Sequence, residues 1–382
     1  HVGSATGTQL GADQTLSGGT ASVTVATGTA PLANAGTYTV YAEYLGTAQV
    51  ETDKTHFTTF TVTKATPTVT FTAGSTDSAQ VGAGITIVVN VSGTGKKAPE
   101  GGTVSLYLGS IGGTPIATST AIATGQNTAT FNFTTGSSQF ANAGAYSIWA
   151  RYNGNTNVSA ADSDTAHSLT LTQVTPTVSI TSVSPASPQT LGTTMSFTVS
   201  VSGSGYSSPT GGTVSLYIGS TAGTPFATSS AMSGGSITIT GVATGSGQLA
   251  NAGTYSILAK FNGNTNVAVA ESATASLVLN QVSSATSLAV SPGGTFSTTT
   301  SYTFTAKITP TTFGGQSGSV SFQEKVSGTF VEIGTGTIAL VAGEYVATFS
   351  KTFAAGTHVI QAVYAGNTNF AGSTSSSLTL GP

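Results

Sequence analysis

Residues 140–152 read FANAGAYSIWARY, and this stretch indicates the fold class. After Gly144 the residues alternate with a period of two, so successive side chains point to opposite faces, as in a β-strand. Good helix formers are sparse along the chain, and 49 of its 382 residues are glycine. The sequence therefore predicts an all-β protein. The strand face that we expect to lie inward carries Tyr146, Ile148, Ala150 and Tyr152.

The stretch recurs, which indicates that the chain is built from repeats. Its central glycine returns as Gly36, Gly144, Gly253 and Gly356, with spacings of 108, 109 and 103 residues. A second marker, GTVSLY at 102–107, recurs at 212–217 and, as GSVSF, at 318–322. Two markers that share one period predict tandem domains, and the short, turn-separated strands of each repeat are typical of an antiparallel β-sandwich.

Proline-containing junctions at 65–69 (ATPTV) and 174–178 (VTPTV) separate the repeats. Proline favours an extended backbone and cannot donate to a strand ladder, so we expect short, stiff connections. The third junction lies at 281–286 (QVSSAT). The predicted complete domains span residues 66–174, 175–283 and 284–382.

Residues 1–65 correspond to only the second part of a repeat, because His1 aligns near residue 108 of the next unit. The strands that residues 66–107 supply to that unit have no counterpart, so we expect an open apolar face on this segment. Two alternatives stay open: an upstream part of the same polypeptide covers the face, or a neighbouring copy of the chain does.

The composition excludes several functions. Lys and Arg number 9 and Asp and Glu 12, so charged residues make up 5% of the chain, against roughly 25% in an average domain. Nine scattered bases form no cationic surface for nucleic acid. The absence of cysteine excludes disulfides and thiolate chemistry. No apolar run is long enough for a membrane-spanning helix.

The strand after the glycine resembles the Tyr-x-Cys strand of immunoglobulin domains, with an aliphatic residue in place of the cysteine. The segments at 318–322, 353–358 and 362–371 (AVYAGNTNFA) resemble the bacterial immunoglobulin-like repeat of the group 3 type. The resemblance is closest in residues 284–382, and it implies tandem immunoglobulin-like β-sandwiches in a linear array. It also implies an exported surface protein of bacteria with a structural or adhesive role. We expect the core of each repeat to be marked by Tyr38, Tyr146, Tyr255 and His358, and by Ile148, Ile257 and Ile360.

Catalytic chemistry is not expected. Residues 175–283 contain only Lys260 and Glu271 as charged groups and no histidine, so an active site cannot recur in every repeat. We predict no cofactor and no metal site, with Asp162 and Asp164 as weak calcium candidates beside an asparagine-rich hairpin. The hairpin, NGNTN at 153–157, recurs at 262–266 and as AGNTN at 365–369. It could be a ligand loop, but we interpret it as turn chemistry that recurs with the fold.

A surface with few charges suits association between copies of the chain, because edge strands normally carry charges that block such pairing. Tyr41, Trp149 and Leu258 lie on the strand face predicted to point outward, and we interpret them as a candidate interface. The favoured hypothesis is an extracellular, non-enzymatic protein that forms or decorates a self-assembling surface filament or array. The alternative is the stalk or repeat region of a large bacterial adhesin. Cell-surface glycans are a further candidate partner, although a single tryptophan argues against a carbohydrate-binding platform.

Overall fold

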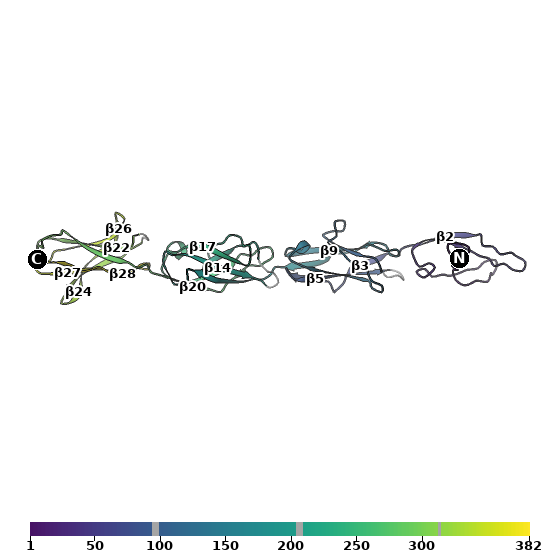
Figure 1. Cartoon of the computed structure of the whole chain (residues 1–382), viewed down its shortest axis with the longest axis horizontal. Helices are drawn as coiled ribbons and strands as arrows, with labels where there is room; N and C mark the ends of the chain where they lie inside the picture. Colours follow the sequence, from purple (N-terminus) through teal and green to yellow (C-terminus); the bar gives the residue numbers. More distant parts are fainter. Residues whose placement is uncertain (94–98, 204–208, 312–314) are drawn as a thin grey trace. The chain divides into compact units, whose positions relative to one another are not determined.

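The computed structural model of the chain describes residues 1–93, 99–203, 209–311 and 315–382. These residues form 29 β-strands and two short 3₁₀ turns, with no α-helix among them (Figure 1). The prediction of an all-β protein is therefore confirmed. The chain divides into two compact units, His1–Val174 and Thr175–Pro382, and each is described by itself.

In the first unit, residues 66–174 form two facing sheets of a sandwich. Alternation in β5 (Gly84–Gly93) buries Ile85, Ile87, Val89 and Val91, and the opposite sheet contributes fully buried residues of β9 (Gly144–Tyr152). All pairs are antiparallel except that β4 runs parallel to β11. One sheet has the order β3 (Pro67–Phe71), β5, β8 (Thr128–Thr134). The other has the order β4 (Ser78–Gln80), β11 (His167–Thr172), β9, β6 (Val104–Leu108), β7 (Ala117–Thr118), with β10 (Ala161–Asp162) beside β9.

In the second unit, residues 175–283 repeat this topology around one apolar core that includes Met195, Phe197, Ile257 and Phe261. The core residues come from both sheets, because each strand contributes every second side chain. The first sheet has the order β12 (Thr177–Ser184), β14 (Thr194–Ser202), β17 (Ser236–Ala243). The second has the order β13 (Gln189–Thr190), β20 (Ala275–Asn280), β18 (Gly253–Phe261), β15 (Val214–Ile218), β16 (Ala227–Thr228), with β19 (Ala270–Glu271) beside β18.

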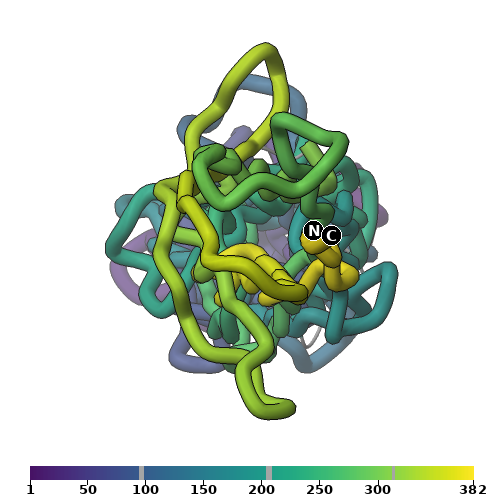
Figure 2. The backbone as a smooth tube through the Cα atoms, turned by 90° about the vertical axis from the view of Figure 1, so that its left-hand side faces the viewer, coloured from purple at the N-terminus to yellow at the C-terminus, as the bar shows by residue number. Residues whose placement is uncertain are grey.

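Residues 284–382 form a sandwich with two longer hairpins, which Figure 2 shows in yellow-green, standing out from this domain. The hairpin of β23 and β24 replaces the two-residue edge strand of the other repeats, and its tip exposes Val326 and Val331. One sheet has the order β21 (Ala285–Ser291), β22 (Tyr302–Thr309), β26 (Glu344–Lys351), β25 (Ala339–Val341). The other has the order β24 (Thr329–Thr337), β23 (Ser319–Val326), β27 (His358–Gly366), β28 (Ala371–Thr374), with β29 (Leu378–Leu380) beside β27.

Residues 1–65 contain one two-stranded sheet, in which β1 (Gly36–Tyr41) pairs with β2 (Phe57–Val62). Val40, at the position of the fully buried Ile148, is only partly buried here. A groove of about 620 Å³ lies beside the sheet, and Val23, Val40 and Phe57 are among the residues that line it. The segment therefore exposes apolar side chains that a complete sandwich would bury. Large apolar residues that are exposed in it are Leu16, Val23, Val25, Leu45, Val50 and Phe57.

Candidate functional site

A tyrosine at the start of the strand after the repeated glycine fixes the loop before it. The hydroxyl groups of Tyr38, Tyr146 and Tyr255 each donate a hydrogen bond of 2.7 Å to the backbone oxygen of the asparagine four residues earlier. This is the tyrosine corner of immunoglobulin-like sandwiches. These tyrosines are half-buried, because the ring covers the edge of the core while the hydroxyl must reach a carbonyl group.

His358 replaces the tyrosine in the fourth domain and keeps the corner bond, since its Nε2 lies 3.0 Å from the backbone oxygen of Ala354. Its Nδ1 faces the Glu324 carboxylate, and its ring lies 4.7 Å from the ring of Phe353, centroid to centroid. His358 is thus held by packing and by acceptors on both ring nitrogens. The aliphatic residues two positions after these corner residues, Ile148, Ile257 and Ile360, are completely buried.

The three asparagines of the 153–157 hairpin have three different tasks. The Asn153 side chain donates to Thr103 Oγ1 (2.9 Å), the residue directly before β6 of its own domain. Asn155 shapes the turn, because its Oδ1 accepts the backbone N–H groups of Asn157 (2.8 Å) and Val158 (2.7 Å). Turn chemistry, as interpreted from the sequence, therefore accounts for Asn155, whereas the Asn153 side chain bonds a distant segment of the same domain.

The side chain of Asn157 leaves its own domain and binds the corner loop of residues 1–65. Its Oδ1 accepts the Ala35 N–H (2.8 Å), and its Nδ2 donates to Asn34 Oδ1 (3.1 Å). The interpretation of this asparagine as a turn residue was wrong, because its partners lie more than 100 positions away in the sequence. Asn34, Lys64 and Asn157 also line a cavity of about 690 Å³ at this junction.

The second unit repeats the contact. Asn369 Oδ1 accepts the Ala252 N–H (2.9 Å), and Asn369 Nδ2 lies 3.2 Å from both Ala250 O and Asn251 Oδ1. Asn367 shapes the turn as Asn155 does, by accepting the N–H groups of Asn369 and Phe370 at 2.9 Å. We call Asn157 and Asn369 the clasp asparagines.

The linker between the domains of each unit is also held. Ala65 exchanges backbone hydrogen bonds with Asn157 and Ser159, both of 2.9 Å, and Val282 does the same with Asn369 (2.8 Å) and Ala371 (2.9 Å). Val282 packs against the cores of both domains that it joins. In each of these linkers one residue has both its backbone N–H and its carbonyl oxygen paired, which restricts rotation about the linker.

The residues proposed as an interface lie on the outer face of the strand after the corner. Trp149 pairs across the sheet with Tyr107, Leu258 with Tyr217, and Tyr41 with Phe57. Trp149 and Leu258 are half-buried, whereas Phe57 is 63% exposed and its ring centroid lies 5.3 Å from that of Tyr41. In each case a large side chain stands across the sheet from an aromatic residue, and Tyr217 is itself buried.

The weak calcium candidates do not come together as a metal site. Asp162 forms an ion pair with Arg151 at 3.5 Å, and Glu271 forms the equivalent pair with Lys260 at the same distance, so this position holds a cross-strand ion pair in both repeats. Asp164 is exposed. Across the described residues, no group of three or more His, Asp, Glu or Cys side chains is placed to hold a metal ion.

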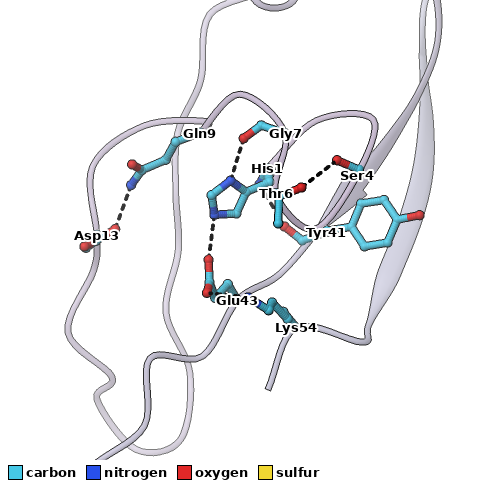
Figure 3. A network of polar contacts seen from close by, with 9 residues as sticks. All are labelled: His1, Ser4, Thr6, Gly7, Gln9, Asp13, Tyr41, Glu43 and Lys54. Atoms are coloured by element: carbon cyan, nitrogen blue, oxygen red, sulfur yellow. Dashed lines mark hydrogen bonds and ion pairs between the residues drawn. The ribbon is translucent and has the colours of Figure 1, made fainter. Parts of the chain in front are cut away.

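A network of polar contacts surrounds His1 in residues 1–65 (Figure 3). The His1 ring lies between Gly7 O (2.8 Å from Nδ1) and the Glu43 carboxylate (2.9 Å from Nε2), and its amino group donates to Tyr41 O at 2.9 Å. Lys54 Nζ lies 3.7 Å from the same carboxylate. These bonds tie the first residues to the end of β1.

The order of strands in the two sheets and the tyrosine corner are those of immunoglobulin-like domains. A buried isoleucine stands where many such domains have a cysteine. Residues 288–381 match the family model described as bacterial Ig-like domain (group 3), which confirms the resemblance seen in the sequence. No curated protein sequence matches the chain. Within the described part of the chain, no helix has the length and apolar character to cross a membrane.

The chain also matches several solved structures, each at low sequence identity and low TM-score. A structure of the Escherichia coli adhesin FdeC has 16% identity, covers 82% of this chain and 96% of its own, and has a TM-score of 0.27. The fibronectin(III)-like modules of Clostridium thermocellum CbhA have 19% identity, cover 56% of this chain and 94% of their own, and have a TM-score of 0.21. The D1–D4 ectodomain fragment of ICAM-5 has 12% identity, covers 82% of this chain and 76% of its own, and has a TM-score of 0.32.

Proposed function

We propose that this chain is an extracellular, non-enzymatic structural protein of a bacterial surface, in which joined Ig-like domains act as a spacer. The observation that carries the proposal is the double attachment at the junctions. At each of the two described junctions one linker residue forms a β-bridge with the hairpin of the following domain, and a clasp asparagine binds the preceding domain. Joints built in this way limit bending between neighbours, which a spacer requires and an isolated binding module does not.

Surface location has a direct test in the bacterium that encodes the chain. Intact cells are treated with a protease that cannot enter them, and the released peptides are identified by mass spectrometry, with a cytoplasmic protein as the control for lysis. The proposal expects peptides of this chain in the supernatant while the control protein stays intact. Release of the chain only after lysis would refute it.

Association between copies is a second candidate function, and two observations favour it. The opening segment exposes apolar residues around its groove, including Leu45 and Phe57. In addition, the two charged side chains of residues 175–283, Lys260 and Glu271, pair with each other, so this domain carries no net charge to repel a second copy. Under this hypothesis the copies would build a filament or array.

Sedimentation velocity and negative-stain imaging over a range of concentrations test the association. We expect larger species as concentration rises, and a single monomeric species throughout would reject the hypothesis. Phe57→Asp should weaken association if the open face is the contact, whereas Val331→Asp, an exposed apolar position of the fourth domain, is the matched control. Trp149→Ala separately tests the outer face of the strand after the corner.

A further inference from the structure

We propose that the clasp asparagines and the corner loops form a domain-pairing code that sets, within each of the two compact units, the orientation of the second domain on the first. The partner recognised by Asn157 or Asn369 is the corner loop of a preceding Ig-like domain that carries an Ala-Asn-Ala sequence. This inference concerns the joints alone, and it holds or fails independently of where the protein resides.

The first argument is that the clasp asparagine is dispensable for the turn in which it stands. Residues 45–49 (LGTAQ) occupy the same place in the opening segment, with Gln49 in the clasp position. The turn forms there nevertheless: Thr47 N–H donates to Val50 O at 2.8 Å, and Thr47 Oγ1 accepts the N–H groups of Gln49 (3.3 Å) and Val50 (3.2 Å). The turn therefore needs a side-chain acceptor at the position of Thr47, which Asn155 occupies in the next domain. It does not need an asparagine at the clasp position, where Gln49 stands.

The second argument is that the asparagine of the corner loop is dispensable for the corner. The fourth domain has Ala354 and Ala355 in this loop and lacks the asparagine, yet His358 still bonds to Ala354 O. At Asn34 and Asn251 the corner bond uses the backbone oxygen of the asparagine and does not occupy its side chain. Asn34 and Asn251 each use that side chain to contact a clasp asparagine.

The third argument is that each clasp asparagine is rigidly positioned. The residue after it, Val158 or Phe370, is completely buried in its own domain. The backbone N–H of the clasp asparagine itself donates to the side chain of Asn155 or Asn367. Its carbonyl oxygen accepts the N–H of the linker residue, Ala65 or Val282. One residue therefore grips the preceding domain at two points, through its side chain and through its backbone. Such a fixed contact selects one orientation of the two domains.

The test uses the full chain with pairs of spin labels, which the absence of native cysteine makes straightforward. Exposed positions on the two domains of the second unit, Thr240→Cys in β17 and Thr348→Cys in β26, receive the labels. Pulsed dipolar spectroscopy measures the distribution of distances between them. We expect a narrow distribution in the parent chain and a broad one in Asn369→Ala.

Hydrogen exchange of the Ala252 amide provides a second readout. Loss of its bond to Asn369 should accelerate exchange roughly 2- to 12-fold, the range that corresponds to the net contribution of one hydrogen bond. Asn369→Asp should keep this amide protected, because a carboxylate still accepts it, but should broaden the distances by losing the donated bonds. Asn251→Ala, on the opposite domain, should broaden the distances while the bond from Tyr255 to the backbone remains.

Thr368→Ala is the matched control, since Thr368 is an exposed neighbour in the same turn. An unchanged distance distribution in both Asn369→Ala and Asn251→Ala would overturn the proposal. Equal broadening in the Thr368→Ala control would also overturn it, because general loosening of the turn would then explain the result. Thermal unfolding of each variant verifies that both domains remain folded.

Discussion

The buried residue at the end of the strand after the corner provides a sharp test of the packing. Tyr152, Phe261 and Tyr364 occupy this position in the three complete domains, and each is at most 1% exposed. The Tyr152 hydroxyl donates to the backbone oxygen of Pro99 at 3.1 Å. The Tyr364 hydroxyl is equally buried, and its near polar neighbour, the Ser317 backbone, does not form a hydrogen bond of normal geometry with it. Phe261 shows that the fold accepts the ring without the hydroxyl group.

The two tyrosines should therefore respond to phenylalanine with opposite signs. A buried hydroxyl group without a partner costs about 1–3 kcal/mol, whereas a satisfied one contributes a net 0.5–1.5 kcal/mol, both as rough ranges. We expect Tyr364→Phe to stabilise the fourth domain by about 1 kcal/mol and Tyr152→Phe to destabilise its domain by about the same amount. For a domain of this size, 1 kcal/mol corresponds to roughly 4–8 °C in melting temperature.

Native-state hydrogen exchange in the full chain measures each domain separately, through the buried amides of β27 and β9. A change of 1 kcal/mol corresponds to about a fivefold change in their exchange rate. Destabilisation by Tyr364→Phe of the same size as by Tyr152→Phe would refute the reasoning, since it would mean that the hydroxyl group has a partner such as a buried water molecule.

The same burial gives a pH dependence. Burial raises the pKa of the Tyr152 and Tyr364 phenols above their ordinary value. A phenol whose pKa is raised on folding favours the folded state while it is protonated, so this stability is complete below about pH 10 and is lost as the pH rises through the folded pKa. Tyrosinate absorbance should show these two groups ionising above the ordinary tyrosine pKa.

Three further predictions concern other parts of the chain. Ile257→Ala removes a completely buried side chain and should destabilise the third domain by about 2–5 kcal/mol in chemical denaturation; a cost below about 1 kcal/mol would mean that the core closes over the cavity. Replacing both Lys260 and Glu271 by glutamine should change stability by no more than about 1 kcal/mol, because the pair is partly exposed; a larger loss, seen by the same method, would show that the pair is structurally essential. The Thr55 backbone N–H and hydroxyl groups donate to Asp53 and lower its pKa. These bonds therefore stabilise the turn fully at pH values above the ordinary aspartate pKa, and the stabilisation is lost as the pH falls through the lowered pKa. In an NMR titration, Thr55→Ala should move the Asp53 midpoint partway back towards the ordinary value, and an unmoved midpoint would contradict the assignment.

Much of the fold could be predicted because its determinants are local. The alternation after each repeated glycine predicts the strand and the burial of its aliphatic residue, and the glycine spacing predicts the period. The long β23–β24 hairpin was not foreseen, since a period found from two markers does not report what lies between them. The parallel contact of β4 with β11 was also not foreseen, because it joins segments about 90 residues apart.

The candidate site was harder to predict for a related reason. The three asparagines of the hairpin look alike in the sequence, and only the partners of their side chains separate Asn155, which shapes a turn, from Asn157, which binds another domain. A comparison with residues 45–49 holds the missing signal, because that turn forms without an asparagine in the clasp position. Asp162 was considered as a calcium ligand because its partner Arg151 becomes its neighbour only when the strands pair.

The clasp has a genetic consequence. Complete repeats such as residues 175–283 carry a corner loop with an asparagine and also a hairpin with an asparagine in the clasp position, so each unit brings both halves of the joint in a single coding period. Unequal crossing-over that gains or loses one whole period of this kind adds or removes one corner-loop asparagine together with one hairpin asparagine. The gene can therefore lengthen or shorten its product without evolving a new joint, whereas recombination out of phase would separate the halves.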